Sequence, residues 1–131
     1  MGKLCARLQD VREAGAYKLS CKLEDVRTDA AQAGFALLEA DLAQVHGKGE
    51  FLASVAQAVK APLWFGQNWD ALADALGDLS WLNAPGYVVL LHNSGETLGL
   101  ASAEHEVVTG IFLDTVSFWK SQGKPFWVFF C

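Results

Sequence analysis

The chain alternates between continuous apolar runs and segments with helical periodicity, and this alternation predicts its elements. Apolar runs at 35–40, 87–91 and 126–130 are expected to form strands. The run at 87–91 has the β-rich composition of a strand that is buried on both faces of a parallel sheet. At 16–23, apolar and polar residues alternate with the period of a half-exposed strand. We therefore expect four strands.

Segments with apolar residues at helical spacing connect these strands. The expected helices, by residue range, are 23–34, about 50–60, 68–77 and 102–122. Asn68 and Ser102 are good N-caps. Gly34 and Gly77 are good helix stops. Strands and helices in this order predict an α/β fold, with a small, mainly parallel sheet covered by helices.

The helix expected between Asn68 and Gly77 combines a buried stripe with a pair of carboxylates. The i, i+3, i+4, i+7 spacing of a buried stripe is met by Trp69, Leu72, Ala73 and Leu76. Asp70 and Asp74 lie one turn apart on another face, so two carboxylates point the same way. Like charges at this spacing repel each other, and only Asp70 lies in the first turn, where the helix dipole favours an anion.

Two carboxylates on a helix are commonly solvated surface residues, but the surroundings of this pair favour a binding site. The preceding segment 63–66 is aromatic where loops are normally polar, and Trp69 and Trp81 bracket the carboxylates. Between Lys60 and Lys120 there is no Lys or Arg, and the acidic residues there are Asp70, Asp74, Asp78, Glu96, Glu104, Glu106 and Asp114. The residues between Lys60 and Lys120 therefore have a formal charge of −7. The rest of the chain has a formal charge of +2, which gives the net charge of −5. A partner rich in Lys and Arg is implied.

The run 64–76 closely resembles the ribonuclease-inhibitor motif of the barstar family, which is aromatic-aromatic-Gly-x-Asn-x-Asp-Ala-Leu-x-Asp-x-Leu. The resemblance covers about residues 35–131 and implies a three-layer, barstar-like α/β fold. Residues 1–34 go beyond the compact form of the family. We therefore expect an N-terminal extension at 1–34, packed on the same domain as a barstar-like domain at 35–131.

The resemblance implies that the acidic helix inserts carboxylates among the cationic groups with which a ribonuclease binds RNA phosphates. Asp74 matches the deepest inserted acid of the family, and Asp70 supports it. The other partner-binding positions that the resemblance implies are Trp64, Gly66, Asn68, Trp69, Ala73, Gly77, Trp81 and Asp114. Ala73 departs from the family, which often has a second aromatic residue there. Trp81 follows a longer turn, as a replacement for an aromatic residue after the helix.

The resemblance therefore implies a cytoplasmic, non-enzymatic inhibitor, similar to an immunity protein or antitoxin. Its expected partner is a basic ribonuclease of the barnase type, bound one to one, and the free protein is expected to be a monomer. The alternative is a barstar-like interaction domain that binds a different basic protein without inhibiting a ribonuclease. No cofactor is expected in either case.

Composition argues against several other classes. A length of 131 residues with 52% hydrophobic residues suits one soluble domain, and the longest apolar runs are far too short to span a membrane. The early charges of the N-terminus do not fit a secretory signal, so we expect the cytoplasm. The acidic balance argues against direct binding of nucleic acid.

Metal, redox and catalytic sites are not favoured either. Cys5, Cys21 and Cys131 are odd in number and lack CxxC spacing, which argues against a disulfide framework and a zinc site. The histidines show no ligand spacing with the carboxylates. Asp70 and Asp74 on one exposed helix lack the difference in environment that separates the pKa values of a catalytic acid and base.

Overall fold

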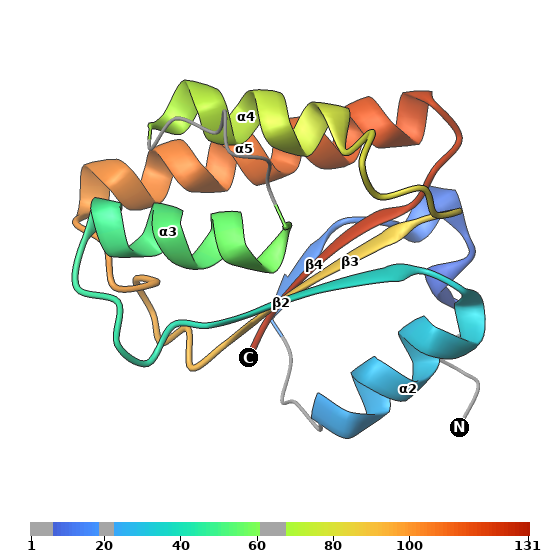
Figure 1. Cartoon of the computed structure of the whole chain (residues 1–131), viewed down its shortest axis with the longest axis horizontal. Coiled ribbons are helices and arrows are strands. Elements are labelled where there is room, and N and C mark those ends of the chain that lie inside the picture. The colour runs from blue at the N-terminus through green and yellow to red at the C-terminus, as the bar shows by residue number, and fades with distance from the viewer. Residues whose placement is uncertain (1–6, 19–22, 61–67) are drawn as a thin grey trace.

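The computed structural model describes residues 7–18, 23–60 and 68–131. Within these residues, four parallel strands form one sheet in the order β1-β4-β3-β2. The strands are β1 (Ala16–Lys18), β2 (Ala36–Asp41), β3 (Tyr87–His92) and β4 (Phe126–Phe130). The helices α3 (Lys48–Ala58), α4 (Trp69–Asp78) and α5 (Ser102–Ser121) cover one face, and α2 (Leu23–Ala33) covers the other (Figure 1). The predicted three-layer α/β fold with a mainly parallel sheet is confirmed.

Two core clusters lie on opposite faces of the sheet, because successive residues of a strand point in opposite directions. In β3, Tyr87, Val89 and Leu91 belong to the cluster under α3, α4 and α5. Val88 and Leu90 belong to the cluster that contains the buried residues of α2. Each of these five side chains is at most 1% exposed. The central strand therefore needs apolar cover on both faces, as its continuous hydrophobic run predicts.

Residues before 35 supply the cover of the second face and one edge of the sheet. A short 3-10 helix, η1 (Val11–Glu13), leads into β1, which pairs with β4. The indole Nε1 of Trp127 donates a hydrogen bond of 2.9 Å to the carbonyl of Leu8, and both residues belong to the core cluster on the face of the sheet that α2 covers. The strand predicted at 16–23 is confirmed over its first three residues, and 19–22 lie outside the described residues.

Helix ends follow the capping predictions only in part. Gly34 follows α2 with a φ of +76°, a left-handed conformation that suits glycine, as predicted. Ser102 is not the N-cap of the last helix but its first residue, and Ala101 takes the cap position without a side-chain hydrogen bond. Burial of the apolar stripe of α5 stabilises this helix, so its start does not require a side-chain cap. Neither α5 nor any other helix in the described part of the chain is long and apolar enough to cross a membrane.

Cys131 lies directly after β4 and is disulfide-bonded. The number and spacing of the cysteines did not indicate such a bond. Cys5 and Cys21 lie outside the described residues.

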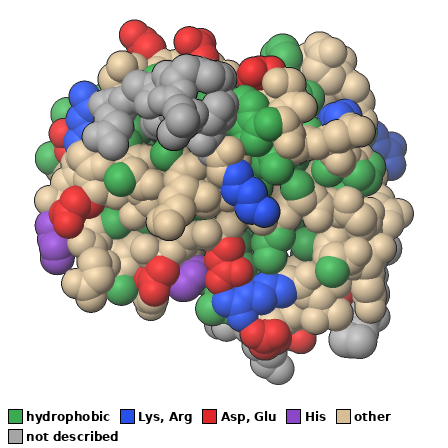
Figure 2. Space-filling view, in the orientation of Figure 1, with side chains coloured by type: hydrophobic (Ala, Val, Ile, Leu, Met, Phe, Trp, Pro, Cys, Tyr) green, Lys and Arg blue, Asp and Glu red, His purple; other side chains and the backbone are tan. Residues whose placement is uncertain are grey.

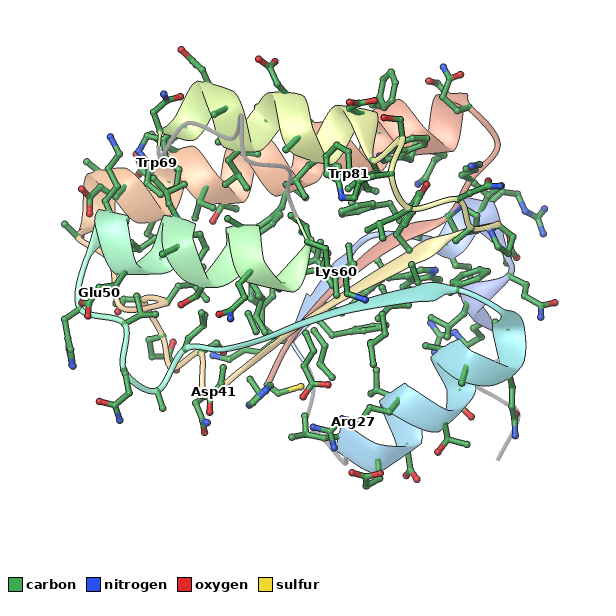
Figure 3. All side chains as sticks on the ribbon, in the orientation of Figure 1. Arg27, Asp41, Glu50, Lys60, Trp69 and Trp81 are labelled. Carbon is green, nitrogen blue, oxygen red and sulfur yellow. The ribbon has the colours of Figure 1, made fainter. Side chains whose placement is uncertain are left out.

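An ion-pair cluster attaches α2 to the edge strand β2, where Figure 2 shows cationic, acidic and His side chains gathered together. Arg27 of α2 donates two hydrogen bonds to Glu39, one of them from Nε to Oε1 over 2.9 Å, and also pairs with Glu24 (Figure 3). His92 Nε2 lies 3.1 Å from Oε2 of Glu39. The hydrogen bonds from Arg27, followed by the charges of Arg27 and His92, lower the pKa of Glu39 against the opposing effect of desolvation.

The substitution Glu39→Gln should make the free energy of unfolding less dependent on pH in acid. Because folding lowers the pKa of Glu39, its contribution is fully present above the unfolded pKa of about 4.3 and is lost as the pH falls through the lower folded pKa. We expect the free energy of unfolding, measured with urea at pH 7 and about pH 3, to fall less in the variant than in the wild type. Glu24→Gln removes the 82%-exposed partner of Arg27 and is the control. The prediction is wrong if both variants retain the full wild-type acid dependence.

Candidate functional site

The helix α4 presents one buried and one open face. Leu72, Ala75 and Leu76 are fully buried in the described structure. The opposite face follows the i, i+3, i+4, i+7, i+8 spacing and consists of Asp70, Ala73, Asp74, Gly77 and Asp78. Ala73, which was expected in the buried stripe, is exposed. The buried face is centred between Leu72 and Leu76, so Ala75 occupies the core position and Ala73 turns outward.

Three carboxylates line the open face of α4. Asp70, Asp74 and Asp78 are exposed and follow one another at one-turn intervals. Figure 2 shows acidic side chains along the edge of the molecule where α4 lies. Within the described part of the chain, no Lys, Arg or His forms an ion pair with any of them. Among the described residues no cation relieves their mutual repulsion by an ion pair, and a cationic partner would relieve it.

Asp78 was not among the predicted site residues. Its spacing of four residues from Asp74 was the signal that could have identified it. The expected helix stop at Gly77 placed Asp78 outside the helix and hid that relation.

The start of α4 is held as the capping pattern predicts. Asn68 has an extended backbone, and its Oδ1 accepts a hydrogen bond of 2.7 Å from the N–H of Ala71. Asp70 lies in the first turn, where the positive end of the helix dipole favours its charge. The first carboxylate of the row is therefore attached to a well-defined helix start.

Trp69 connects the start of α4 to α3 (Figure 3). Its half-buried ring lies 6.0 Å from the ring of Phe51, measured between centroids, and the Nζ of Lys48 lies 5.6 Å from its centroid. These are an aromatic contact and a cation–π contact. Trp69 thus packs against α3 with part of its surface and leaves the rest accessible beside the carboxylates.

The end of α4 lies beyond the predicted stop. Gly77 is inside the helix, and the left-handed C-cap is Leu79, with a φ of +47° and an N–H that donates to the carbonyl of Ala75. A left-handed residue other than glycine costs about 1–2 kcal/mol. The Leu79 side chain is fully buried, which stabilises by about 1.5–3 kcal/mol and offsets that cost. Burial therefore decides the helix end, against the local preference for glycine.

Two indole groups hold the surroundings of α4 in place. Trp119 of α5 donates from Nε1 to the carbonyl of Leu76 over 2.8 Å. Trp81, which lies just beyond α4 in Figure 3, donates from Nε1 to the carbonyl of Val59 over 2.9 Å. Trp81 is half-buried and packs against the core, so this predicted partner-binding residue also has a structural contact.

A groove runs between α4 and α5 beside the row of carboxylates. It is lined by Ala73, Gly77, Ile111, Asp114, Thr115 and Phe118. Most of the lining is apolar, and Asp114 is exposed at its rim. The fold therefore brings together Ala73, Gly77 and Asp114, three predicted site residues from two helices that are far apart in the sequence.

The aromatic residues that precede α4 in the sequence fall within 61–67, outside the described ranges. Trp64 and Gly66, both predicted to bind the partner, lie outside the described residues. Among the described residues, no group of three or more His, Cys, Asp or Glu side chains is placed to hold a metal ion. The described site consists of carboxylates, small residues and aromatic rings, and this combination is suited to binding a cationic surface.

Comparison with protein-family models identifies the family. A family model described as Barstar (barnase inhibitor) matches residues 35–131, which is well over half of the chain. The chain belongs to the Barstar family. No curated protein matched it. The Barstar match begins after α2 and includes all of α4, α5 and the groove between them.

The substitution Asn68→Ala should lower the free energy of unfolding by about 1 kcal/mol, because the N–H of Ala71 loses its acceptor. Asn68→Asp should keep most of the stability, since a carboxylate accepts the same bond and suits the helix dipole. Urea unfolding of the three proteins tests this. An equal loss in both variants would show that the cap does not contribute through its side-chain oxygen.

The substitution Gly77→Ala should raise the free energy of unfolding by about 0.5–1 kcal/mol. Gly77 has no left-handed backbone, and a Cβ at this position meets nothing within 4 Å. Gly86→Ala is the control that should destabilise, because its Cβ would lie 2.6 Å from Cζ of Phe35. Thermal unfolding measures both. A destabilising Gly77→Ala would contradict the placement of this residue inside a regular helix.

Proposed function

We propose that this Barstar-family protein inhibits a ribonuclease of the barnase type by placing the open face of α4 in the cationic active site of the enzyme. The observation that supports this most directly is the row of Asp70, Asp74 and Asp78, with which no cation in the described ranges 7–18, 23–60 and 68–131 forms an ion pair. A chain of this family with such a row is suited to a strongly basic target.

The chemistry of the target explains why carboxylates inhibit it. Ribonucleases that act without a metal bind RNA phosphates with Arg, Lys and His side chains and use such groups to move protons. A carboxylate in the same position carries the charge of the phosphate and can accept the same hydrogen bonds, but it provides no bond to cleave. Under this proposal Asp74 enters deepest and Asp70 supports it from the preceding turn.

Rigidity of α4 adds to the proposed inhibition. The Asn68 cap, the buried Leu79 and the hydrogen bond from Trp119 hold the helix before any partner binds. Preorganised groups lose less conformational freedom on binding, so more of the interaction energy is retained as affinity. The carboxylates are therefore presented by a fixed surface.

The proposed interface extends beyond the carboxylates, since a stable complex buries about 800 Å² on each partner. On the N-terminal side of α4 it includes Asn68 and Trp69, and on the α5 side it includes Asp114. The remaining proposed contacts are Trp64, Gly66, Ala73, Gly77 and Trp81. The complex contains one copy of each protein, and the free inhibitor is a monomer without catalytic activity.

The proposed setting is that of an immunity protein or antitoxin in the cytoplasm, where it protects the cell from the ribonuclease. Residues 1–34 are proposed to be an extension packed on the same domain as 35–131. The pairing of β1 with β4 and the ion pair between α2 and β2 support this proposal.

A second candidate is an interaction domain that binds a different basic protein without inhibiting a ribonuclease. The exposed Ala73 favours it, because the family often has an aromatic residue at this position. In that case the acidic face is the same but its partner is not a nuclease.

Inhibition of RNA cleavage by barnase-type ribonucleases tests the proposal. The wild type should inhibit stoichiometrically, and Asp74→Ala should weaken inhibition by about 30-fold or more, the effect of removing one member of a desolvated charge pair, about 2 kcal/mol or above. Barnase–barstar is itself among the complexes that define that range. Asp70→Ala should weaken inhibition less.

The matched control is Asp25→Ala, which removes an exposed carboxylate from the first turn of α2, on the other face of the sheet. It should inhibit like the wild type, and circular dichroism should show that all variants are folded. Inhibition that survives both Asp74→Ala and Asp70→Ala would exclude α4 as the binding element. A wild type that leaves cleavage untouched would favour the second candidate.

A further inference from the structure

The open face of α4 and the adjoining side of α5 form three parallel rows of side chains. The outer row is Asp70, Asp74 and Asp78, the middle row is Ala73 and Gly77, and the third row, on α5, is Ile111, Asp114 and Phe118. Neither residue of the middle row carries more than a methyl group. The middle row is therefore the floor of the groove, and the larger side chains of α5 form its wall.

Apolar side chains of α5 form the wall of the groove. Phe118 is 44% exposed, and its ring packs edge-on against Trp119, with 5.1 Å between the ring centroids. Ile111, two turns earlier on α5, also lines the groove and is half-buried. A Cβ added at Gly77 would meet nothing within 4 Å, so the space above the floor is open. Such a slot suits a large apolar side chain, because filling it removes apolar surface from water on both sides.

Carboxylates lie in and next to the groove: Asp114 lines it, and Asp74 and Asp78 directly follow the floor residues Ala73 and Gly77 in the sequence. Asp74 and Asp78 lie on α4 and Asp114 on α5, all of them exposed. In the residues that the structure describes, no cation forms an ion pair with any of the three. A mainly apolar slot that is lined by Asp114 and adjoins the acidic face of α4 is complementary to an apolar side chain that is flanked by Lys or Arg.

We propose that the groove between α4 and α5 is the anchor site for one large aromatic side chain of a basic protein partner. Lys and Arg residues next to that aromatic residue pair with Asp114 and with the carboxylates on the adjoining face of α4. Aromatic residues fit best because they bury a large area and lose little conformational freedom. This inference rests on the proposed function for the statement that a basic protein binds at α4, and it adds which side chain of that partner enters the groove.

Ala73 determines whether the anchor can enter. Its side chain is the smallest that still favours a helix, and it lies on the floor, where any larger side chain would occupy the slot from within. The exposed position tolerates substitution, since no core residue depends on it. Ala73 is therefore a specificity-determining residue that selects partners with an aromatic anchor.

Titration of the full-length, ¹⁵N-labelled protein with two peptides tests the anchor site. One is acetyl-Lys-Lys-Trp-Lys-Lys-amide, and the other has Ala in place of Trp and the same charge. The Trp peptide should bind about tenfold or more tightly than the Ala peptide. The largest changes in amide chemical shift that occur with the Trp peptide but not with the Ala peptide should be those of Ala73, Gly77, Ile111 and Phe118.

Two variants separate the groove from the charge around it. Ala73→Phe fills the slot and Phe118→Ala removes its wall, so each should weaken binding of the Trp peptide about tenfold and leave the Ala peptide unaffected. Leu113→Ala is the control, because Leu113 is 50% exposed on α5 but does not line the groove, and it should not change binding. Amide spectra of the free variants report whether each is folded.

The proposal is overturned if the Trp peptide does not bind, if the two peptides bind equally, or if Ala73→Phe binds the Trp peptide like the wild type. The titration contains no ribonuclease, so its outcome is independent of the RNA-cleavage assay. Loss of inhibition in Asp74→Ala together with equal peptide affinities would retain the inhibitor and exclude the anchor. Selective Trp binding without inhibition of any ribonuclease would retain the anchor and exclude the inhibitor.

Discussion

Burial of β3 on both faces is the constraint on which the rest of the structure depends. Its side chains alternate between two core clusters, and no part of the strand can face water without a large loss of hydrophobic stabilisation. One face requires α2, and the other requires α3, α4 and α5 together. The buried stripe of α4 is needed to close the cluster that it shares with α3 and α5, so its opposite face is directed to the solvent. The acidic surface is thus oriented by the core.

The same packing explains how α4 tolerates a row of like charges. Repulsion between carboxylates at one-turn intervals costs a few tenths of a kcal/mol per pair. Full burial of Leu72, Leu76 and Leu79 contributes several times more, at about 1.5–3 kcal/mol for each side chain. The fold therefore has enough stability to hold a surface that is unfavourable by itself. That unfavourable surface is what a basic partner would stabilise.

Hydrophobic patterning predicted the parallel sheet and the helices that cover it, because period and length depend only on local sequence. The cap at Asn68 was also predictable, since its side-chain oxygen accepts a hydrogen bond from an N–H only three residues away, that of Ala71. The ends of other helices were not. Leu79 adopts a left-handed backbone because its side chain is buried among residues from other elements. Rules based on the neighbouring sequence do not include the stabilisation that this burial provides. For the same reason Ala73 was assigned to the wrong face.

The carboxylate pair, the Barstar motif and the acidic charge between Lys60 and Lys120 were determined by the sequence alone, because spacing on one helix and residue counts require no knowledge of packing. Tertiary structure decided that Asp78 extends the row and that Asp114 lies beside Ala73 and Gly77. It also decided that a groove exists there. A groove is formed between two helices, and the distance and rotation that relate α4 to α5 are set by the shared core beneath them.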